Sequence, residues 1–260
     1  MFDVKRAQIV ARRDPRTPKE SSYLAPEHVQ QTTLGDILRG LRPIPEDQQI
    51  RLGITDETCK GLRLWVAGDV SLIRKSCVAV VGARKVSSQG AARARRIGCE
   101  LARAGVVIVS GLAYGVDTQV LTSAIDAGGR VIAVIGTPVD TAYPAANKRL
   151  QELIYREHLL VSQFQPGKRV FPTNFPERNK LMAAISDATV IIEASDTSGS
   201  LHQAAECVRL NRWLFIAKSI MDDPNLKWPH EFSKYQNMKI LRSTSDIFQT
   251  LGLSSLCHST

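Results

Sequence analysis

The sequence has few cysteines and no long apolar run, and both absences exclude classes of protein. Its five cysteines stand singly along 260 residues, at Cys59, Cys77, Cys99, Cys207 and Cys257. No C-x-x-C pair occurs, so neither a metal site nor a disulfide framework is expected. No stretch approaches the roughly 20 apolar residues of a membrane span, and the first residues lack the apolar core of a signal peptide. We therefore expect a cytoplasmic protein with no membrane contact and no bound metal.

Three motifs of nucleotide and catalytic sites are also missing. The turn after the first expected core strand reads GARKVSSQG, which lacks the G-x-G-x-x-G pattern, and the next strand ends in Ser110 instead of a ribose-binding acid. The phosphate loop G-x-x-x-x-G-K-[ST] is absent. No serine or cysteine nucleophile can be assigned a base and a third, orienting residue. We therefore expect no cofactor and no catalytic residue, that is, a protein that is not an enzyme.

Charge gives the first positive indication of a partner. The chain carries 34 Lys and Arg against 25 Asp and Glu, a formal net charge of +9. Such an excess attracts polyanions, and their counterions are released on binding. Nucleic acid is the leading candidate, although the charge alone is equally compatible with a soluble basic protein that binds none.

The hydrophobic pattern predicts an α/β fold. From Val78 onward, apolar runs of four to six residues alternate with amphipathic stretches, which is typical of parallel strands buried on both faces. Strands are predicted at 78–81, 106–109, 131–135, 159–161, 190–192 and 214–217, with an edge strand near 62–69 and a short strand at 238–241. Helices are predicted at 89–103, 117–127, 146–157, 177–186, 201–210 and 244–251. The expected architecture is an extended Rossmann-like, doubly wound and mostly parallel sheet with a short N-terminal arm.

The same pattern divides the chain into three parts. Residues 1–60 are polar and contain five prolines, and we interpret them as an arm or small cap. Residues 61–220 form the Rossmann-like core. Residues 221–260 are expected to extend this core with a strand and a helix, without a full winged helix.

Small residues follow several predicted strands, at the edge where parallel sheets bind ligands. They include Gly82, with Arg84 and Lys85 just after it, then Ser110 and Gly111 in SGLAYGVD, and the turn Ser198, Gly199, Ser200. Such residues let the backbone approach a phosphate, which the N-terminus of the following helix also attracts. For any one glycine alone, a plain tight turn is the favoured explanation. Their convergence at one sheet edge predicts an anion-binding trough.

The segment NFPERNK supplies a second candidate site, with Asn174, Phe175, Arg178, Asn179 and Lys180. A base can stack on Phe175 while Arg178 and Lys180 hold the neighbouring phosphates, as in binders of single-stranded nucleic acid. The alternative is a hydrophobic staple beside a solvated helix face. Asp117 is expected to cap the N-terminus of a helix, and Glu193 is expected to pair with a nearby basic side chain.

Four motifs taken together resemble the DNA-processing protein A (Smf) family over about residues 62–218. They read VAVVGARKVSSQG, VVIVSGLAYGVD, AGGRVIAVIGTPVDTAYPAAN and NFPERNKLMAAISDATVIIEASDTSGSL. The resemblance implies a basic pocket that binds and protects single-stranded DNA, a homodimer, and the loading of a RecA-type recombinase in natural transformation or recombination. By position, it implies that Arg84, Phe175, Arg178, Asn179, Lys180 and the Ser198–Ser200 turn line the pocket.

The sequence departs from the family after its last core strand, where SIMDDPNLKWPHEF replaces a glycine-rich turn. Two other functions use the same kind of trough. One is a SLOG-type module that senses a nucleotide. The other is a LOG-type nucleoside monophosphate phosphoribohydrolase, which is disfavoured because His202 and Gln203 stand where that enzyme class has its carboxylate.

Overall fold

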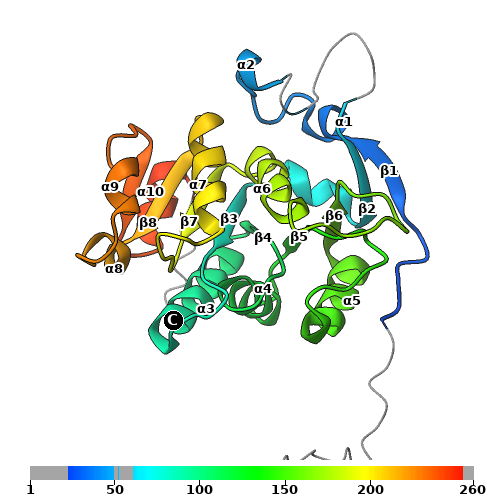
Figure 1. Ribbon diagram of the computed structural model, residues 1–260, viewed down its shortest axis with the longest axis horizontal. Helices are drawn as coiled ribbons and strands as arrows, with labels where there is room; N and C mark the ends of the chain where they lie inside the picture. Colours follow the sequence, from blue (N-terminus) through cyan, green and yellow to red (C-terminus); the bar gives the residue numbers. More distant parts are fainter. Residues whose placement is uncertain (1–22, 50–51, 53–60, 254–260) are drawn as a thin grey trace, which may run out of the picture.

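A nine-stranded sheet forms the centre of the computed structural model, which describes residues 23–49, 52 and 61–253 (Figure 1). The strand order is β1-β2-β6-β5-β4-β3-β7-β8-β9. Seven strands, β3 to β9, are parallel, and β1 and β2 are added antiparallel at one side. The bounds are β1 Gln30–Thr33, β2 Arg63–Gly68, β3 Cys77–Val81, β4 Val107–Ser110, β5 Val131–Ile135, β6 Leu159–Ser162, β7 Ala188–Ile191, β8 Trp213–Ala217 and β9 Met238–Leu241.

Helices cover both faces of the sheet, so the expected doubly wound α/β fold is confirmed. One face carries α3 Ser88–Arg103, α4 Val116–Asp126, α5 Lys148–Glu157 and α10 Ser245–Leu251. The other carries α1 Leu34–Leu38, α6 Asn174–Ala184, α7 Ser200–Arg209, α8 Lys218–Met221 and α9 Trp228–Phe232. The remaining short helices are α2 Glu46–Gln49, η1 Val70–Arg74 and η2 Ala145–Asn147. No helix in the described ranges is long and apolar enough to span a membrane.

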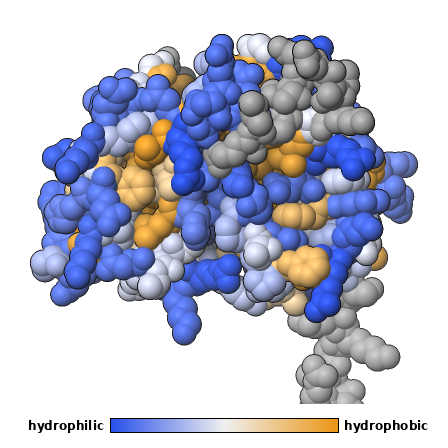
Figure 2. Space-filling model, turned by 45° about the horizontal axis from the view of Figure 1, so that its top comes forward, coloured by the Kyte–Doolittle hydropathy of each residue, from blue (hydrophilic) through white to orange (hydrophobic). Residues whose placement is uncertain are grey.

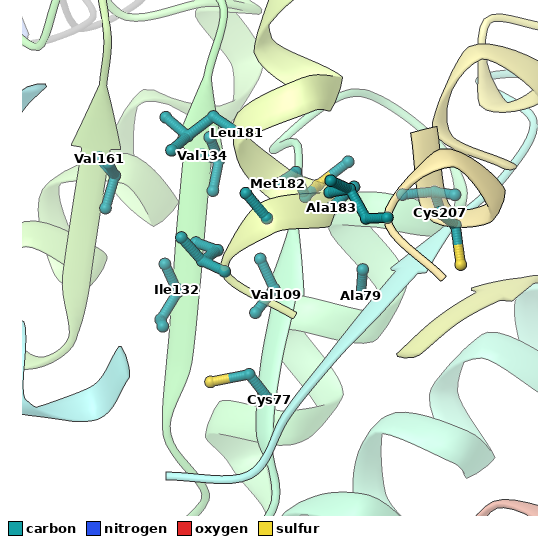
Figure 3. Packing of buried hydrophobic residues seen from close by; sticks show 14 of the residues in the cluster. Cys77, Ala79, Val109, Ile132, Val134, Val161, Leu181, Met182, Ala183 and Cys207 are labelled. Atoms are coloured by element: carbon teal, nitrogen blue, oxygen red, sulfur yellow. The ribbon is translucent and has the colours of Figure 1, made fainter. Parts of the chain in front are cut away.

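The strands are apolar throughout because alternate residues enter two different cores. In β3, Val78 and Val80 pack towards α3 and α4, whereas Ala79 and Val81 pack towards α6 and α7. Figure 3 shows Leu181, Met182 and Ala183 of α6 packed over the sheet beside Val109 and Val134. This double burial produces the continuous apolar runs from which the parallel strands could be predicted.

Two elements, β2 and α6, differ from the sequence-based expectation in ways that have a clear physical reason. β2 is not the edge strand, because β1 pairs along its outer side, with Gln30 opposite Val66 and Thr33 opposite Arg63. β1 reads QQTT, so backbone pairing and not an apolar pattern forms it. Helix α6 begins at Asn174 instead of 177, since Pro176 is tolerated in a first turn that needs no N–H donor there. The three-part division of the chain stays a prediction, and residues 1–22, 50–51, 53–60 and 254–260 lie outside the described residues.

The direction of winding reverses between β3 and β7. Strands β3, β4, β5 and β6 follow one another towards one edge, and β7, β8 and β9 follow one another towards the other. In open α/β sheets, a crevice opens at such a switch point, beyond the carboxyl ends of the two central strands. The fold therefore places the loops after β3 and β7 at the ligand-binding position of this architecture.

A buried arginine fastens the N-terminal segment to the opposite, amino-terminal end of the sheet. Arg42 donates to both carboxylate oxygens of Asp187, at 2.7 and 3.0 Å, and to the carbonyl oxygens of Ile73 and Lys75, both at 2.6 Å. The same carboxylate accepts the N–H of Cys77 at 2.8 Å. Three segments that are distant in sequence thus share one charge cluster.

We predict that Arg42→Ala lowers the free energy of unfolding by about 3 to 5 kcal/mol, because it leaves a carboxylate and two carbonyls without their donor. Arg39→Ala is the matched control, since Arg39 pairs with Asp36 at the surface and its loss should cost less than about 1 kcal/mol. Urea denaturation of both variants measures the difference. An equal decrease in the free energy of unfolding of both variants would show that the Arg42 cluster stabilises the fold no more than a surface ion pair.

His158 is a second buried polar group, at the amino end of β6. It is 3% exposed, and neither ring nitrogen has a hydrogen-bond partner within the described ranges. Burial lowers the pKa of its imidazole below the ordinary value of 6.5, the charge of Arg130 lowers it further, and Glu157 acts in the opposite direction. The folded protein therefore resists a proton that the unfolded chain accepts.

We predict that the free energy of unfolding falls as the pH drops below 6.5, because the unfolded chain then binds a proton that the folded His158 excludes until its lower pKa is reached. His158→Phe should reduce this fall, whereas replacement of the exposed His230 should not. Urea unfolding between about pH 8 and pH 5 tests both variants. A pH dependence unchanged in His158→Phe would contradict the assignment.

Candidate functional site

A cleft of about 1210 Å³ lies at the switch point of the sheet. Its walls are the loop after β3, the loop after β7, the first turns of α6 and α7, and the segment just before α6. Small-ligand pockets usually measure about 300–1,000 Å³. This cleft is larger and can hold more than one nucleotide unit.

Nine of the thirteen residues expected at the site line this cleft, and four do not. The lining residues are Gly82, Arg84, Lys85, Phe175, Arg178, Asn179, Ser198, Gly199 and Ser200. Of the other four, three have structural partners and Asn174 is buried. The hydroxyl of Ser110 donates to the carbonyl of Val80 at 2.7 Å, and Gly111 lies against the guanidinium of Arg178. Asn174 is buried at the start of α6, and Lys180 pairs with Glu177 at 2.7 Å.

Phe175 is a half-buried ring that three neighbours hold in place. It packs against Gly136, where an added Cβ would stand 2.6 Å from Cδ1 of the ring. The ring of Tyr143 lies beside it, with 5.2 Å between centroids. The guanidinium of Arg84 lies over it, 5.8 Å from the ring centroid. An aromatic surface next to a cation is the arrangement that stacks a nucleobase.

Arg178 lies buried at the base of the cleft and not at its surface. Its Nη1 donates to the carbonyl of Val134 at the end of β5, and Nε has no partner among the described residues. Burial lowers the pKa of its guanidinium to about 10, against the opposing effect of Asp117. The guanidinium therefore stays charged at neutral pH and places a positive charge at the floor of the cleft.

The sequence suggested that Asp117 caps α4, but its side chain instead holds the loop after β4. Its Oδ2 accepts the N–H groups of Gly111 at 3.1 Å and Ala113 at 3.2 Å. The side chain of Asn147 closes the same loop by donating to the carbonyl of Leu112 at 2.9 Å. Desolvation raises the pKa of Asp117, while Arg178 and the two amides lower it.

The two helix N-termini at the switch point differ in their occupancy. At α3, the carboxylate of Glu193 accepts the N–H of Ser87 at 3.0 Å and its hydroxyl at 2.6 Å, so a protein anion already occupies this end. The expected pairing of Glu193 with a basic side chain is therefore wrong, since its partner is Ser87. At α7, Gly199 gives no side-chain cap, and the buried hydroxyl of Ser200 has no partner among the described residues. The α7 end is the one available to a phosphate.

The lining of the cleft carries more cations than acids: Arg84, Lys85, Arg93 and Arg178 against Asp117, Glu193 and Asp223. Arg84, Lys85 and Arg93 line it, and none forms an ion pair within the described part of the chain. Its acids have other partners: Asp117 and Glu193 as above, and Asp223 accepts the N–H of Asn225 at 2.9 Å. No group of three or more His, Cys, Asp or Glu that could hold a metal occurs in the described ranges.

Sequence reasoning missed Arg93, Tyr143 and Phe171, which also line the cleft. Arg93 could have been found, because it lies in the first turns of α3, just after the turn GARKVSSQG. Tyr143 and Phe171 belong to loops whose course depends on the packing of the whole edge. No local pattern indicates them.

Two glycine substitutions compare a tightly packed position beneath the cleft, Gly111, with an open position on its surface, Gly199. We predict that Gly111→Ala destabilises the protein by about 1 to 3 kcal/mol, because its Cβ would overlap the buried guanidinium of Arg178. Gly199→Ala should change stability by less than about 0.5 kcal/mol, since nothing lies within 4 Å of its Cβ position. Thermal unfolding compares them. Equal stability of the two variants would argue against a tightly packed Arg178.

Comparison with known proteins agrees with this architecture. The model of the family described as DNA recombination-mediator protein A matches residues 47–252. DNA processing protein DprA of Streptococcus pneumoniae is 41% identical over 160 residues, which cover 61% of this chain and 56% of the relative. The chain spans about half the length of such curated relatives.

Two solved structures share the fold along most of the chain. The crystal structure of DprA from S. pneumoniae has a TM-score of 0.70 at 31% identity and covers 86% of this chain and 74% of its own. DNA processing protein A of Helicobacter pylori, whose structure is described as showing a single-stranded DNA binding mode, has a TM-score of 0.66 at 26% identity and covers 86% and 96%. The fold, the switch-point cleft and the family match lead to one conclusion: this chain belongs to the DNA recombination-mediator protein A family.

Proposed function

We propose that this protein binds single-stranded DNA in the switch-point cleft and performs no chemistry on it. The observation that carries the proposal is the ring of Phe175, half-buried under the unpaired guanidinium of Arg84 in a cleft whose lining has more cations than acids. The H. pylori relative, with its described binding of single-stranded DNA, supports the same function.

The proposed complex uses two kinds of contact. The phosphates of the strand lie near Arg84, Lys85 and Arg93 and at the N-terminus of α7. Their contacts with the three cations release the counterions of the DNA. A base stacks on Phe175, which is worth about 1–3 kcal/mol and depends little on sequence. Duplex DNA binds less well, because its bases must first be unstacked at a cost of about a few kcal/mol.

The absence of catalysis is proposed from the state of the acids. The three acids that line the cleft accept hydrogen bonds from backbone amides or from Ser87. Gln203, at the position of the hydrolase carboxylate, is fully buried and donates to Thr189 at 3.1 Å. Asp117 and Glu193 are thus engaged in holding loops, and Asp223 uses Oδ1 to hold Asn225, so we propose that none of the three stabilises an oxocarbenium-like state.

A nucleotide sensor is the second candidate, and one observation favours it. The hydroxyl of Ser200, Oε1 of Gln203 and Nε of Arg178 are buried polar atoms without partners among the described residues, and all three side chains line the cleft. A small polar ligand could satisfy them. Competition by free nucleotides distinguishes this function from the binding of a strand.

The partners are proposed from the family resemblance. We propose that the protein acts in the cytoplasm as a homodimer, protects single-stranded DNA, and helps to load a RecA-type recombinase in transformation or recombination. The basic cleft supports the DNA part of this proposal. Sedimentation with and without a RecA-type protein tests the other parts.

We predict that Arg84→Ala weakens binding and reduces the slope of log affinity against log salt concentration by about one, because one phosphate contact is lost. Phe175→Leu should weaken binding by about tenfold with an unchanged slope, since stacking releases no counterion. Fluorescence anisotropy with a labelled oligothymidylate at several salt concentrations measures both. Lys180→Ala is the control, because Lys180 pairs with Glu177 outside the cleft lining.

The assignment fails if all three variants lose affinity equally. It also fails if the wild type binds duplex as well as single strands. Displacement of the oligothymidylate by micromolar free nucleotide would favour the sensor instead.

A further inference from the structure

Two exposed rings line the cleft together with Phe175. Four large apolar side chains are exposed in the described ranges: Leu24, Tyr114, Tyr143 and Phe171. Two of them, Tyr143 and Phe171, line the cleft, and Phe171 is 50% exposed. Exposed aromatic surface inside a cleft is typical of a binding site.

Phe171 repeats the arrangement of Phe175. The guanidinium of Arg169 lies 5.6 Å from the ring centroid of Phe171, as that of Arg84 lies 5.8 Å from the centroid of Phe175. Both rings line the same cleft, and one turn of chain separates them, since the N–H of Asn174 donates to the carbonyl of Phe171 at 3.0 Å. Each ring therefore offers an aromatic face with its own cation.

The segment that carries Phe171 is anchored on both sides of it. The N–H of Gly167 donates to the Asp140 carboxylate at 2.7 Å, and the N–H of Phe175 donates to the carbonyl of Pro172 at 3.4 Å. Residues 163–173 contain no acid and include Lys168 and Arg169, both exposed. The charge of this segment suits the phosphates of a strand that leaves Phe175.

We infer that Phe171, with Arg169 over its ring, is a second base-stacking platform, so that the strand is held at two bases and not at one. The inference rests on the proposed function and extends it to the path of the strand: one base stacks on Phe175, and a neighbouring base stacks on Phe171 at the mouth of the cleft. The Arg169 guanidinium contacts the phosphate that accompanies this second base.

Oligothymidylates of increasing length test the inference by anisotropy. Phe171→Leu keeps an apolar side chain but removes the aromatic face, and it should weaken the binding of long oligonucleotides about tenfold while leaving the shortest ones unaffected. Phe171→Trp should restore the affinity. Phe175→Leu should weaken binding at every length. Tyr114→Leu is the matched control, because Tyr114 is 49% exposed and lies outside the cleft lining.

Photocrosslinking gives a positive readout that does not depend on lost affinity. An oligonucleotide that carries 5-iodouracil should crosslink to wild-type protein within the tryptic peptide 170–178, which contains both rings. In Phe175→Leu, the crosslink should persist and map to Phe171 by fragmentation. In the double variant with Phe171→Leu, it should disappear.

The outcomes separate the two proposals. If wild type binds the oligonucleotide but Phe171→Leu matches it at every length and no crosslink maps to Phe171, the second platform is overturned and the proposed function stands. If Phe171→Leu changes only the oligomeric state, the ring is a contact between copies and the inference is equally overturned. If wild type binds no single strand, the proposed function fails and the inference fails with it.

Discussion

The cleft depends on one buried cation. The guanidinium of Arg178 meets the carbonyl of Val134 at the end of β5, the charge of Asp117, and the closely approaching backbone of Gly111. Because Asp117 binds the amides of the loop after β4, this single charge joins α6, β5 and that loop. A buried charge is costly unless partners surround it, so these segments have one favourable arrangement. Phe175 lies three residues before Arg178 on the same helix and is fixed with it at the sheet edge.

The two helix N-termini at the cleft differ, because a carboxylate of the protein occupies one and the other is open to a phosphate. In dinucleotide-binding folds, the first βα turn holds the pyrophosphate at the N-terminus of its helix. Here Glu193 occupies the corresponding end of α3, and the open end belongs to α7 on the other side of the switch point. This displacement explains in physical terms why the chain has no G-x-G-x-x-G motif: a glycine turn for close phosphate approach has no use beside a resident carboxylate.

The sequence predicted the parallel strands because burial on both faces leaves a continuous apolar run. It predicted the cleft because small residues follow β3 and β7, whereas Ser110 and Gly111 after β4 lie outside the lining. It could not predict β1, whose QQTT has no apolar pattern. Nor could it separate Arg178 from Lys180: both are cations in NFPERNK, yet helix geometry buries the first and pairs the second with Glu177. Tyr143 and Phe171 depend on loop packing that no short motif records. The DNA contacts of individual residues remain predictions.

Gly136 has a consequence for the breadth of recognition. Its missing side chain lets the ring of Phe175 pack directly against the backbone, so Gly136, Tyr143 and Arg84 together hold the ring in one position. Such a ring loses little side-chain entropy on association. It also cannot adapt to one base in preference to another. On the proposed function, a ring held in this way stacks purines and pyrimidines alike, and the protein tolerates any DNA sequence.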